Sequence, residues 1–151
     1  MDYQTLLNFV PIPNLLELKK VLFIGPHPDD IEYGCGGLVS ELVGLGAKVR
    51  FLIVTDGGSG SFEFGNIEKI KEIRKEESTQ AAKYLGIEKV DILDFPDGGI
   101  YSIDEMAKKI AKRILEFYPD TVFCPDPLLE TKNPSWPFKY CKSYSKSFID
   151  F

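Results

Sequence analysis

The sequence is poor in the residues that many kinds of functional site require. It contains one histidine and three cysteines in 151 residues. The cysteines are too few and too widely spaced for a disulfide framework or a Cys-x-x-Cys metal site, so we expect free thiols in a reducing compartment. No apolar run approaches the ~20 residues that span a bilayer, and no basic cluster precedes an apolar stretch near the start. We therefore expect a cytoplasmic protein with no membrane segment.

Positive charge is also scarce. The chain has 18 basic and 23 acidic residues, which gives a net charge of −5. Phosphate backbones and anionic lipids are bound by basic surfaces, so we expect neither nucleic acid nor a membrane as a partner. The hydrophobic fraction of 44% is that of a chain that buries a core, which excludes disorder for most of its length. The length matches one domain.

Four short apolar runs predict β-strands, over residues 21–25, 49–54, 90–95 and 121–124. None alternates strictly between apolar and polar residues, which is typical of parallel strands that are buried on both faces. Segments with helical periodicity separate them, over residues 34–46, 67–85 and 102–118. We therefore predict an α/β fold, a Rossmann-like three-layer sandwich with a mostly parallel sheet.

Two of the predicted helices carry further local signals. Ser102 and Glu105 form a capping box at the start of the last helix. In the helix over residues 67–85, we expect the buried face to contain Ile67, Ile70, Ile73, Ala81 and Tyr84.

The last 22 residues differ from the rest of the chain. Residues 130–151 carry four lysines and two acidic residues, whereas residues 1–129 carry a net charge of −7. No apolar period is visible in this segment. Two interpretations stay open: a solvated tail, or a departure from the ancestral reading frame near Leu129.

Acidic residues follow all four predicted strands. They are Asp29 and Asp30, Asp56, Asp97, and Asp126. Because ligands of parallel sheets bind beyond the carboxyl ends of the strands, we expect these side chains to border one cleft together with the sole histidine, His27. So much negative charge at one edge is best tolerated when a cation binds there.

His27 and Asp30 are three residues apart on a predicted tight turn. An imidazole nitrogen and a carboxylate oxygen with this spacing can converge on one divalent ion at about 2.0–2.2 Å, for which zinc is the natural candidate. Asp29 lies between them and can point elsewhere, where an ionised carboxylate beside an activated water serves as general base. A buried or capping histidine is the alternative, but the flanking prolines and the doubled aspartate favour a metal site.

Four motifs resemble those of one enzyme family. PHPDDIEYGCGG follows the first strand, TDGGSGS follows the second, IRKEESTQAAKYLGI lies in the next helix, and FPDGGI follows the third strand. Together they resemble the LmbE-like (PIG-L) zinc-dependent N-deacetylases, including those that act on N-acetylglucosaminyl compounds, over about residues 21–129. The resemblance implies zinc as cofactor, His27 and Asp30 as its ligands, and Asp29 as general base. It also implies that Arg74 lies near the substrate sugar and that Asp97 binds a sugar hydroxyl.

The implied reaction is hydrolytic N-deacetylation of a small N-acetyl amino sugar. The family's third zinc ligand lies in a His-x-Asp-His type element after the fourth strand, where this chain reads PDPLLETK. Asp126 and Glu130 are the acidic residues that can substitute there. With His27 and Asp30 alone, we expect weak zinc binding and slow or undetectable deacetylation.

Members of this family are also longer than this chain. We therefore expect a leader over residues 1–20, an incomplete LmbE-like deacetylase domain over residues 21–129, and an atypical tail over residues 130–151. The alternative is a non-catalytic protein, either a truncated or frame-shifted remnant or a sugar-binding domain without metal chemistry. The acceptor sugar stays open, as does the choice between a monomer and a homo-oligomer.

Overall fold

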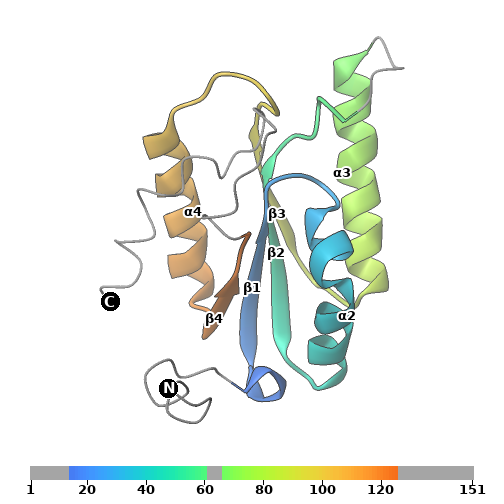
Figure 1. Ribbon diagram of the computed structural model, residues 1–151, viewed down its shortest axis with the longest axis vertical. Coiled ribbons are helices and arrows are strands. Elements are labelled where there is room, and N and C mark those ends of the chain that lie inside the picture. Colours follow the sequence, from blue (N-terminus) through green and yellow to red (C-terminus); the bar gives the residue numbers. More distant parts are fainter. Residues whose placement is uncertain (1–13, 61–65, 126–151) are drawn as a thin grey trace, which may run out of the picture.

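The computed structural model describes residues 14–60 and 66–125. These form, in chain order, η1 (Leu15–Glu17), β1 (Lys20–Gly25), α2 (Asp30–Gly44), β2 (Lys48–Thr55), α3 (Ile67–Tyr84), β3 (Val90–Phe95), α4 (Ile103–Phe117) and β4 (Thr121–Phe123). All strand pairs are parallel, and the strand order is β3-β2-β1-β4. Helices α2 and α3 cover one face of the sheet and α4 covers the other (Figure 1). The predicted three-layer α/β fold is confirmed.

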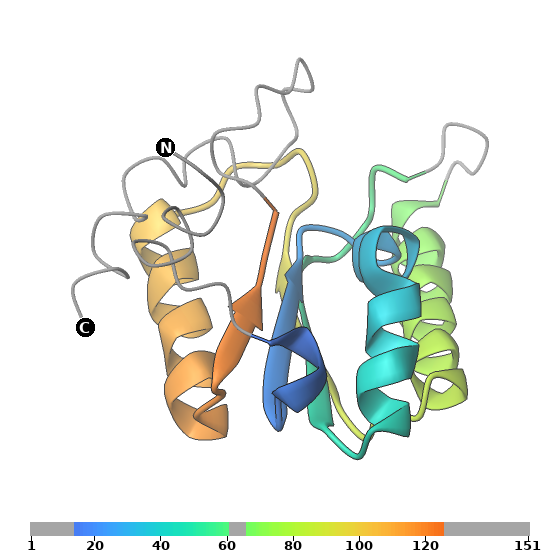
Figure 2. The same ribbon diagram turned by 60° about the horizontal axis from the view of Figure 1, so that its bottom comes forward.

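Alternate residues of each central strand enter two different cores. In β1, Val21 and Phe23 pack on the side of α2 and α3, whereas Leu22 and Ile24 pack on the side of α4. Figure 2 shows these two layers on either side of the strands. Burying one such side chain contributes about 1.5–3 kcal/mol, so both faces of the strand stabilise the sheet. This double burial is why the strand sequences lack a polar-apolar alternation.

Helix α2 begins at Asp30, not at residue 34 as the glycine run suggested. Asp30 and Glu32 occupy its first turn, where negative charge is favourable beside the positive end of the helix dipole. The glycines lie inside the helix at a cost of about 1 kcal/mol each relative to alanine. Asp30 is therefore fixed on a helix. Cys35, on the same helix, is a free thiol packed against the core.

Helix α3 buries only part of the face that was expected. Its buried residues are Ile70, as expected, and Ser78 and Ala82, which were not. Three of the expected residues are exposed instead, with exposed fractions of 58% for Ile67, 41% for Ile73 and 93% for Tyr84. Near its start α3 faces polar groups, since Lys71 pairs with Asp56 of the segment after β2, so apolar residues alone do not mark the inner face of this part of the helix.

Helix α4 agrees well with its sequence signals. The Ser102 hydroxyl accepts a hydrogen bond from the backbone N–H of Glu105 at 3.3 Å, as the capping box predicts. Met106 and Phe117 are its buried residues. The helix ends before Tyr118, which caps it with a left-handed backbone (φ 52°).

The topology brings several loops to one end of the sheet. Strand β1 pairs with β2 on one side and with β4 on the other, so the carboxyl end of β1 is the topological switch point at which ligands bind in such sheets. Asp126 and the predicted tail lie outside the described residues. Within the described part of the chain, no helix is long and apolar enough to cross a membrane.

Candidate active site

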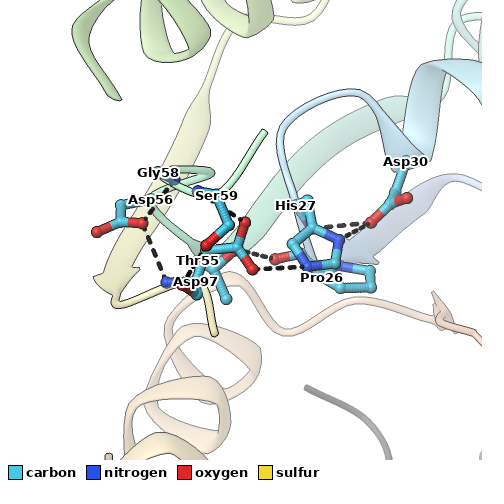
Figure 3. Close-up of polar contacts among 8 residues, drawn as sticks. All are labelled: Pro26, His27, Asp30, Thr55, Asp56, Gly58, Ser59 and Asp97. Atoms are coloured by element: carbon cyan, nitrogen blue, oxygen red, sulfur yellow. Dashed lines mark hydrogen bonds and ion pairs between the residues drawn. The ribbon is translucent and has the colours of Figure 1, made fainter. Parts of the chain in front are cut away.

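His27 follows β1 on a turn that is firmly held by β2. The carbonyl oxygen of Pro26 accepts hydrogen bonds from both the backbone N–H and the hydroxyl of Thr55, at 2.9 and 2.8 Å. Thr55 is 1% exposed, so these bonds are protected from water. They fix the start of the turn that carries His27 (Figure 3).

Asp30 lies on one side of the His27 imidazole. Its Oδ2 accepts a hydrogen bond from the backbone N–H of His27 at 2.8 Å and lies 3.0 Å from the ring Nδ1 (Figure 3). Two ligand atoms of a tetrahedral zinc ion are about 3.4 Å apart when each lies about 2.1 Å from the metal. The observed pair therefore needs only a small movement to share one ion. The Asp30 side chain is 29% exposed, which leaves this side of the ring open.

Asp97 lies on the other side of the same ring. Its Oδ1 is 3.2 Å from Nε2 of His27, and its side chain is 7% exposed. Burial lowers the pKa of His27, but the hydrogen bonds and charges of Asp30 and Asp97 outweigh burial and raise the pKa to about 9. The contact with His27 in turn lowers the pKa of the Asp97 carboxyl. In the metal-free protein the imidazole is therefore a cation between two carboxylates at neutral pH.

Asp56 joins the loops that follow β2 and β3. Its Oδ1 accepts hydrogen bonds from the backbone N–H groups of Gly58 and Asp97, at 2.9 and 3.1 Å. Its Oδ2 forms an ion pair with Lys71 Nζ at 3.2 Å, and the Asp56 side chain is 9% exposed. These contacts of Asp56 hold the segment after β3 in place and so fix the position of Asp97.

Asp29 and Arg74 form an ion pair beside the turn. Arg74 Nη1 lies 3.0 Å from Asp29 Oδ2, with the two side chains 26% and 58% exposed. Asp29 has a backbone φ of 100°, in the region that favours glycine, so its conformation is strained. Strain of this kind clusters at functional sites. The pair joins two residues to which the family resemblance gives separate roles, as base and as substrate contact.

Two cavities open at this edge of the sheet. One, of about 290 Å³, is lined by Asp56 and Lys71 among others. The other, of about 110 Å³, is lined by Asp29 and Arg74 among others. Pro28 lines both cavities.

The structure brings six of the predicted site residues into one contact network or beside it. His27 contacts Asp30 and Asp97, and Asp97 is joined to Asp56. Asp29 follows on the same turn and brings in Arg74. Asp126 lies outside the described residues. Across residues 14–60 and 66–125, no three His, Cys, Asp or Glu side chains are arranged to hold one metal ion.

Two residues of this network were not predicted from the sequence. Ser59 donates its backbone N–H to Asp97 Oδ2 at 3.3 Å and its hydroxyl to the Asp97 carbonyl at 2.7 Å. Lys71 neutralises Asp56. Ser59 lies in the TDGGSGS motif, which was the available signal, whereas Lys71 looks like one more charge of a solvated helix face.

Comparison with known families identifies the chain. Residues 22–134 match the PIG-L family, described as GlcNAc-PI de-N-acetylase. The chain belongs to the PIG-L family. The LmbE-like resemblance of its four motifs is thereby confirmed.

Relatives in this family are deacetylases, enzymes that hydrolyse amide bonds. The diacetylchitobiose deacetylase of Thermococcus kodakarensis is 37% identical over 115 residues, which cover 75% of this chain and 43% of the relative. A probable N-acetyl-alpha-D-glucosaminyl L-malate deacetylase 2 of Bacillus cereus is 34% identical over 122 residues, which cover 72% of this chain and 56% of the relative. The chain thus spans about half the length of the curated relatives it matches.

A solved structure supports the same placement. The N,N'-diacetylchitobiose deacetylase of Pyrococcus horikoshii superposes with a TM-score of 0.80 at 28% sequence identity. The match covers 98% of this chain and 60% of that enzyme. The structural comparison therefore agrees with the family match.

Proposed function

We propose that this chain carries the N-terminal half of the active site of a zinc-dependent deacetylase that hydrolyses the N-acetyl amide of an amino sugar. The observation that carries the proposal is the convergence of His27 Nδ1 and Asp30 Oδ2, 3.0 Å apart at the switch point of the sheet. The relatives named above act on acetylated amino sugars according to their names, which supports the substrate class. Because the chain spans only about half of those relatives, the activity of the whole protein is part of the proposal.

His27 and Asp30 fit two positions of a zinc site. They offer one imidazole nitrogen and one carboxylate oxygen, the donor types that zinc accepts, and Asp30 is open to solvent on that side. A catalytic zinc ion has three protein ligands and keeps a fourth position for water or substrate. The third ligand must come from residues outside the described ones, where Asp126 and Glu130 are candidates. When bound, zinc supplies Lewis-acid polarisation of the acetyl carbonyl and makes an attacking water more acidic.

Asp29 is the proposed general base. It neighbours the ligand pair in sequence, its side chain is 58% exposed, and it can therefore reach a water in the open side of the site. Arg74 orients the Asp29 carboxylate by a charge-assisted hydrogen bond and keeps further N–H groups for sugar hydroxyls. The proton that Asp29 accepts is the one that the leaving amine requires when the amide bond breaks.

A non-catalytic protein is the second candidate. It is favoured by the sequence after β4, which reads PDPLLETK where the family has its His-x-Asp-His type element, and by the single histidine of the whole chain. Such a protein is either a truncated or frame-shifted remnant or a sugar-binding domain without metal chemistry. The coding DNA discriminates between them, because a His-x-Asp-His element encoded in another frame beyond the Leu129 codon supports the remnant.

The test of the proposed function is acetate release from N,N'-diacetylchitobiose and N-acetylglucosamine in the presence of zinc. We expect slow release by the 151-residue chain, and at least a hundredfold faster release once a third ligand and an oxyanion donor are supplied by a longer chain, since one oxyanion donor alone contributes ~10²–10³ in rate. Asp29→Asn should abolish release, whereas Asp94→Asn, which replaces an exposed carboxylate within β3, should not change it. Unchanged release by Asp29→Asn would contradict the assigned base. Binding of the sugar that persists in EDTA, without any release, would support the metal-free binding domain.

A further inference from the structure

His27 presents its two ring nitrogens to two different carboxylates. Nδ1 faces Asp30 at 3.0 Å and Nε2 faces Asp97 at 3.2 Å (Figure 3). The two surroundings differ in exposure, since the Asp30 side chain is 29% exposed and the Asp97 side chain 7%. Nδ1 therefore lies beside a partly exposed carboxylate, and Nε2 lies beside a buried one.

The Asp97 carboxylate is held rigidly against Nε2. The backbone N–H of Asp97 is bound by Asp56, and Ser59 binds both the side-chain Oδ2 and the main-chain carbonyl of Asp97. Its Oδ1 is buried, and among the described residues Nε2 of His27, 3.2 Å away, is the donor that faces it. A buried carboxylate oxygen that lacks a donor is costly, and this cost is relieved by a proton on Nε2.

We propose that Asp97 is a positioning residue that keeps the proton on Nε2 of His27 and so reserves Nδ1 for the metal beside Asp30. The inference rests on the proposed zinc site and adds which atom of the ring binds the ion. Metal-ligating histidines commonly donate the second ring N–H to a carboxylate, which fixes the tautomer and the ring orientation.

The opposite arrangement, with zinc between Nε2 and Asp97, is disfavoured by exposure. A catalytic metal keeps one position open to water and substrate. Asp97 is almost completely buried, and its second oxygen is already bound by Ser59. The position between Nδ1 and Asp30 satisfies the requirement for access, because Asp30 is partly exposed.

Nuclear magnetic resonance tests the proposal directly, because His27 is the sole histidine and its ring signals need no assignment. Long-range ¹H–¹⁵N spectra of the ¹⁵N-labelled chain report the protonation of each ring nitrogen. Without metal both nitrogens carry a proton at neutral pH, and we expect Hε2, which faces the buried Asp97 carboxylate, to exchange with water more slowly than Hδ1. The slow Hε2 signal should be lost in Asp97→Ala, which removes the acceptor, and kept in Asp94→Ala, the same substitution at an exposed position of the neighbouring strand β3. Unchanged backbone amide spectra in both variants establish that the fold is intact.

The same spectra recorded after addition of zinc show which ring nitrogen binds the metal. We expect the Nδ1 signal to move to a metal-bound position while Nε2 keeps its proton, and the zinc affinity of Asp97→Ala to fall by about 10–100-fold. Zinc on Nε2, or a slowly exchanging Hε2 signal that survives in Asp97→Ala, overturns the proposal. Ring nitrogens that do not respond to saturating zinc overturn the zinc site itself. In that case the Hε2 signal still decides whether Asp97 holds the ring, so the two failures are distinguishable.

Discussion

The guanidinium of Arg74 lies 3.0 Å from the carboxylate of Asp29, although the two residues are 45 positions apart in the sequence. Arg74 comes from α3 and Asp29 from the turn after β1. The contact therefore couples the proposed general base to the helix that packs beside it. It also explains how one charge of a solvated-looking helix becomes part of the site.

Replacing Arg74 by alanine should weaken catalysis without unfolding the chain. A hydrogen bond to a charged group contributes about 1.5–3 kcal/mol, so kcat/KM for acetate release should fall roughly 10–100-fold. Arg113→Ala on α4 is the matched control, because it removes an arginine paired with Asp91 and Glu116. Steady-state kinetics of both variants provide the measurement. An equal loss of kcat/KM in the two variants would contradict a specific role of Arg74 in the site.

Asp56 should contribute mainly to stability. Alanine at this position leaves the N–H groups of Gly58 and Asp97 without their acceptor, and each loss costs about 1–3 kcal/mol. Asparagine keeps an acceptor oxygen and loses only the charge facing Lys71. The free energy of unfolding measured in urea should therefore be highest for the wild type, lower for Asp56→Asn and lowest for Asp56→Ala. Equal stability of the alanine and asparagine variants would contradict this role of the Asp56 oxygen as an acceptor.

Gly57 should tolerate no side chain. Its φ of 67° already disfavours an L-residue, and a Cβ would lie 2.9 Å from the ring of Pro28. Gly46 also has a positive φ, of 85°, but a Cβ there meets nothing within 4 Å. We expect Gly57→Ala to be less stable than Gly46→Ala by about 1–3 kcal/mol, because overpacking adds to the backbone strain. Thermal unfolding of the two variants measures this difference. Equal losses of stability would show that the contact between the new Cβ and Pro28 contributes nothing.

The stability of the metal-free protein should fall as the pH rises from neutral. Burial opposes the charged form of His27, but the contacts with Asp30 and Asp97 outweigh it and raise the pKa to about 9 from 6.5. A folded-state pKa above the unfolded one gives a stabilisation that is complete below pH 6.5 and is lost as the pH passes about 9. Its size is on the order of 3 kcal/mol. Urea unfolding in EDTA measures this loss, and His27→Gln, which has no titrating ring, should show a flatter profile.

Local sequence signals were sufficient for the strands. In β1 and β2 both faces are buried, so their apolar runs are visible without knowledge of the fold. The start of α2 was missed because its glycines suggested a loop, whereas packing against the sheet stabilises a helix that carries them. The inner face of α3 was missed because Ser78 is buried there and Tyr84 is not.

The residues of the candidate site could be selected from the sequence, but the contacts between them could not. The rule that ligands bind at the carboxyl ends of parallel strands selected His27, Asp56 and Asp97. Their pairing depends on how the loops after β1, β2 and β3 meet, which is a tertiary property without a sequence pattern. The pairing of Arg74 with Asp29 depends in the same way on the rotation of α3 against the sheet.

The most direct test of the account is a zinc titration of the wild-type chain, Asp30→Asn and Asp94→Asn, followed by competition with a chromophoric chelator. His27 and Asp30 are proposed as two ligands of one ion, so we predict one zinc per chain and an affinity at least about 100-fold lower in Asp30→Asn, since loss of even an outer partner costs about 10–100-fold. Asp94→Asn, which is exposed, should bind zinc as the wild type does. Equal zinc affinity in all three chains would contradict the proposed metal site.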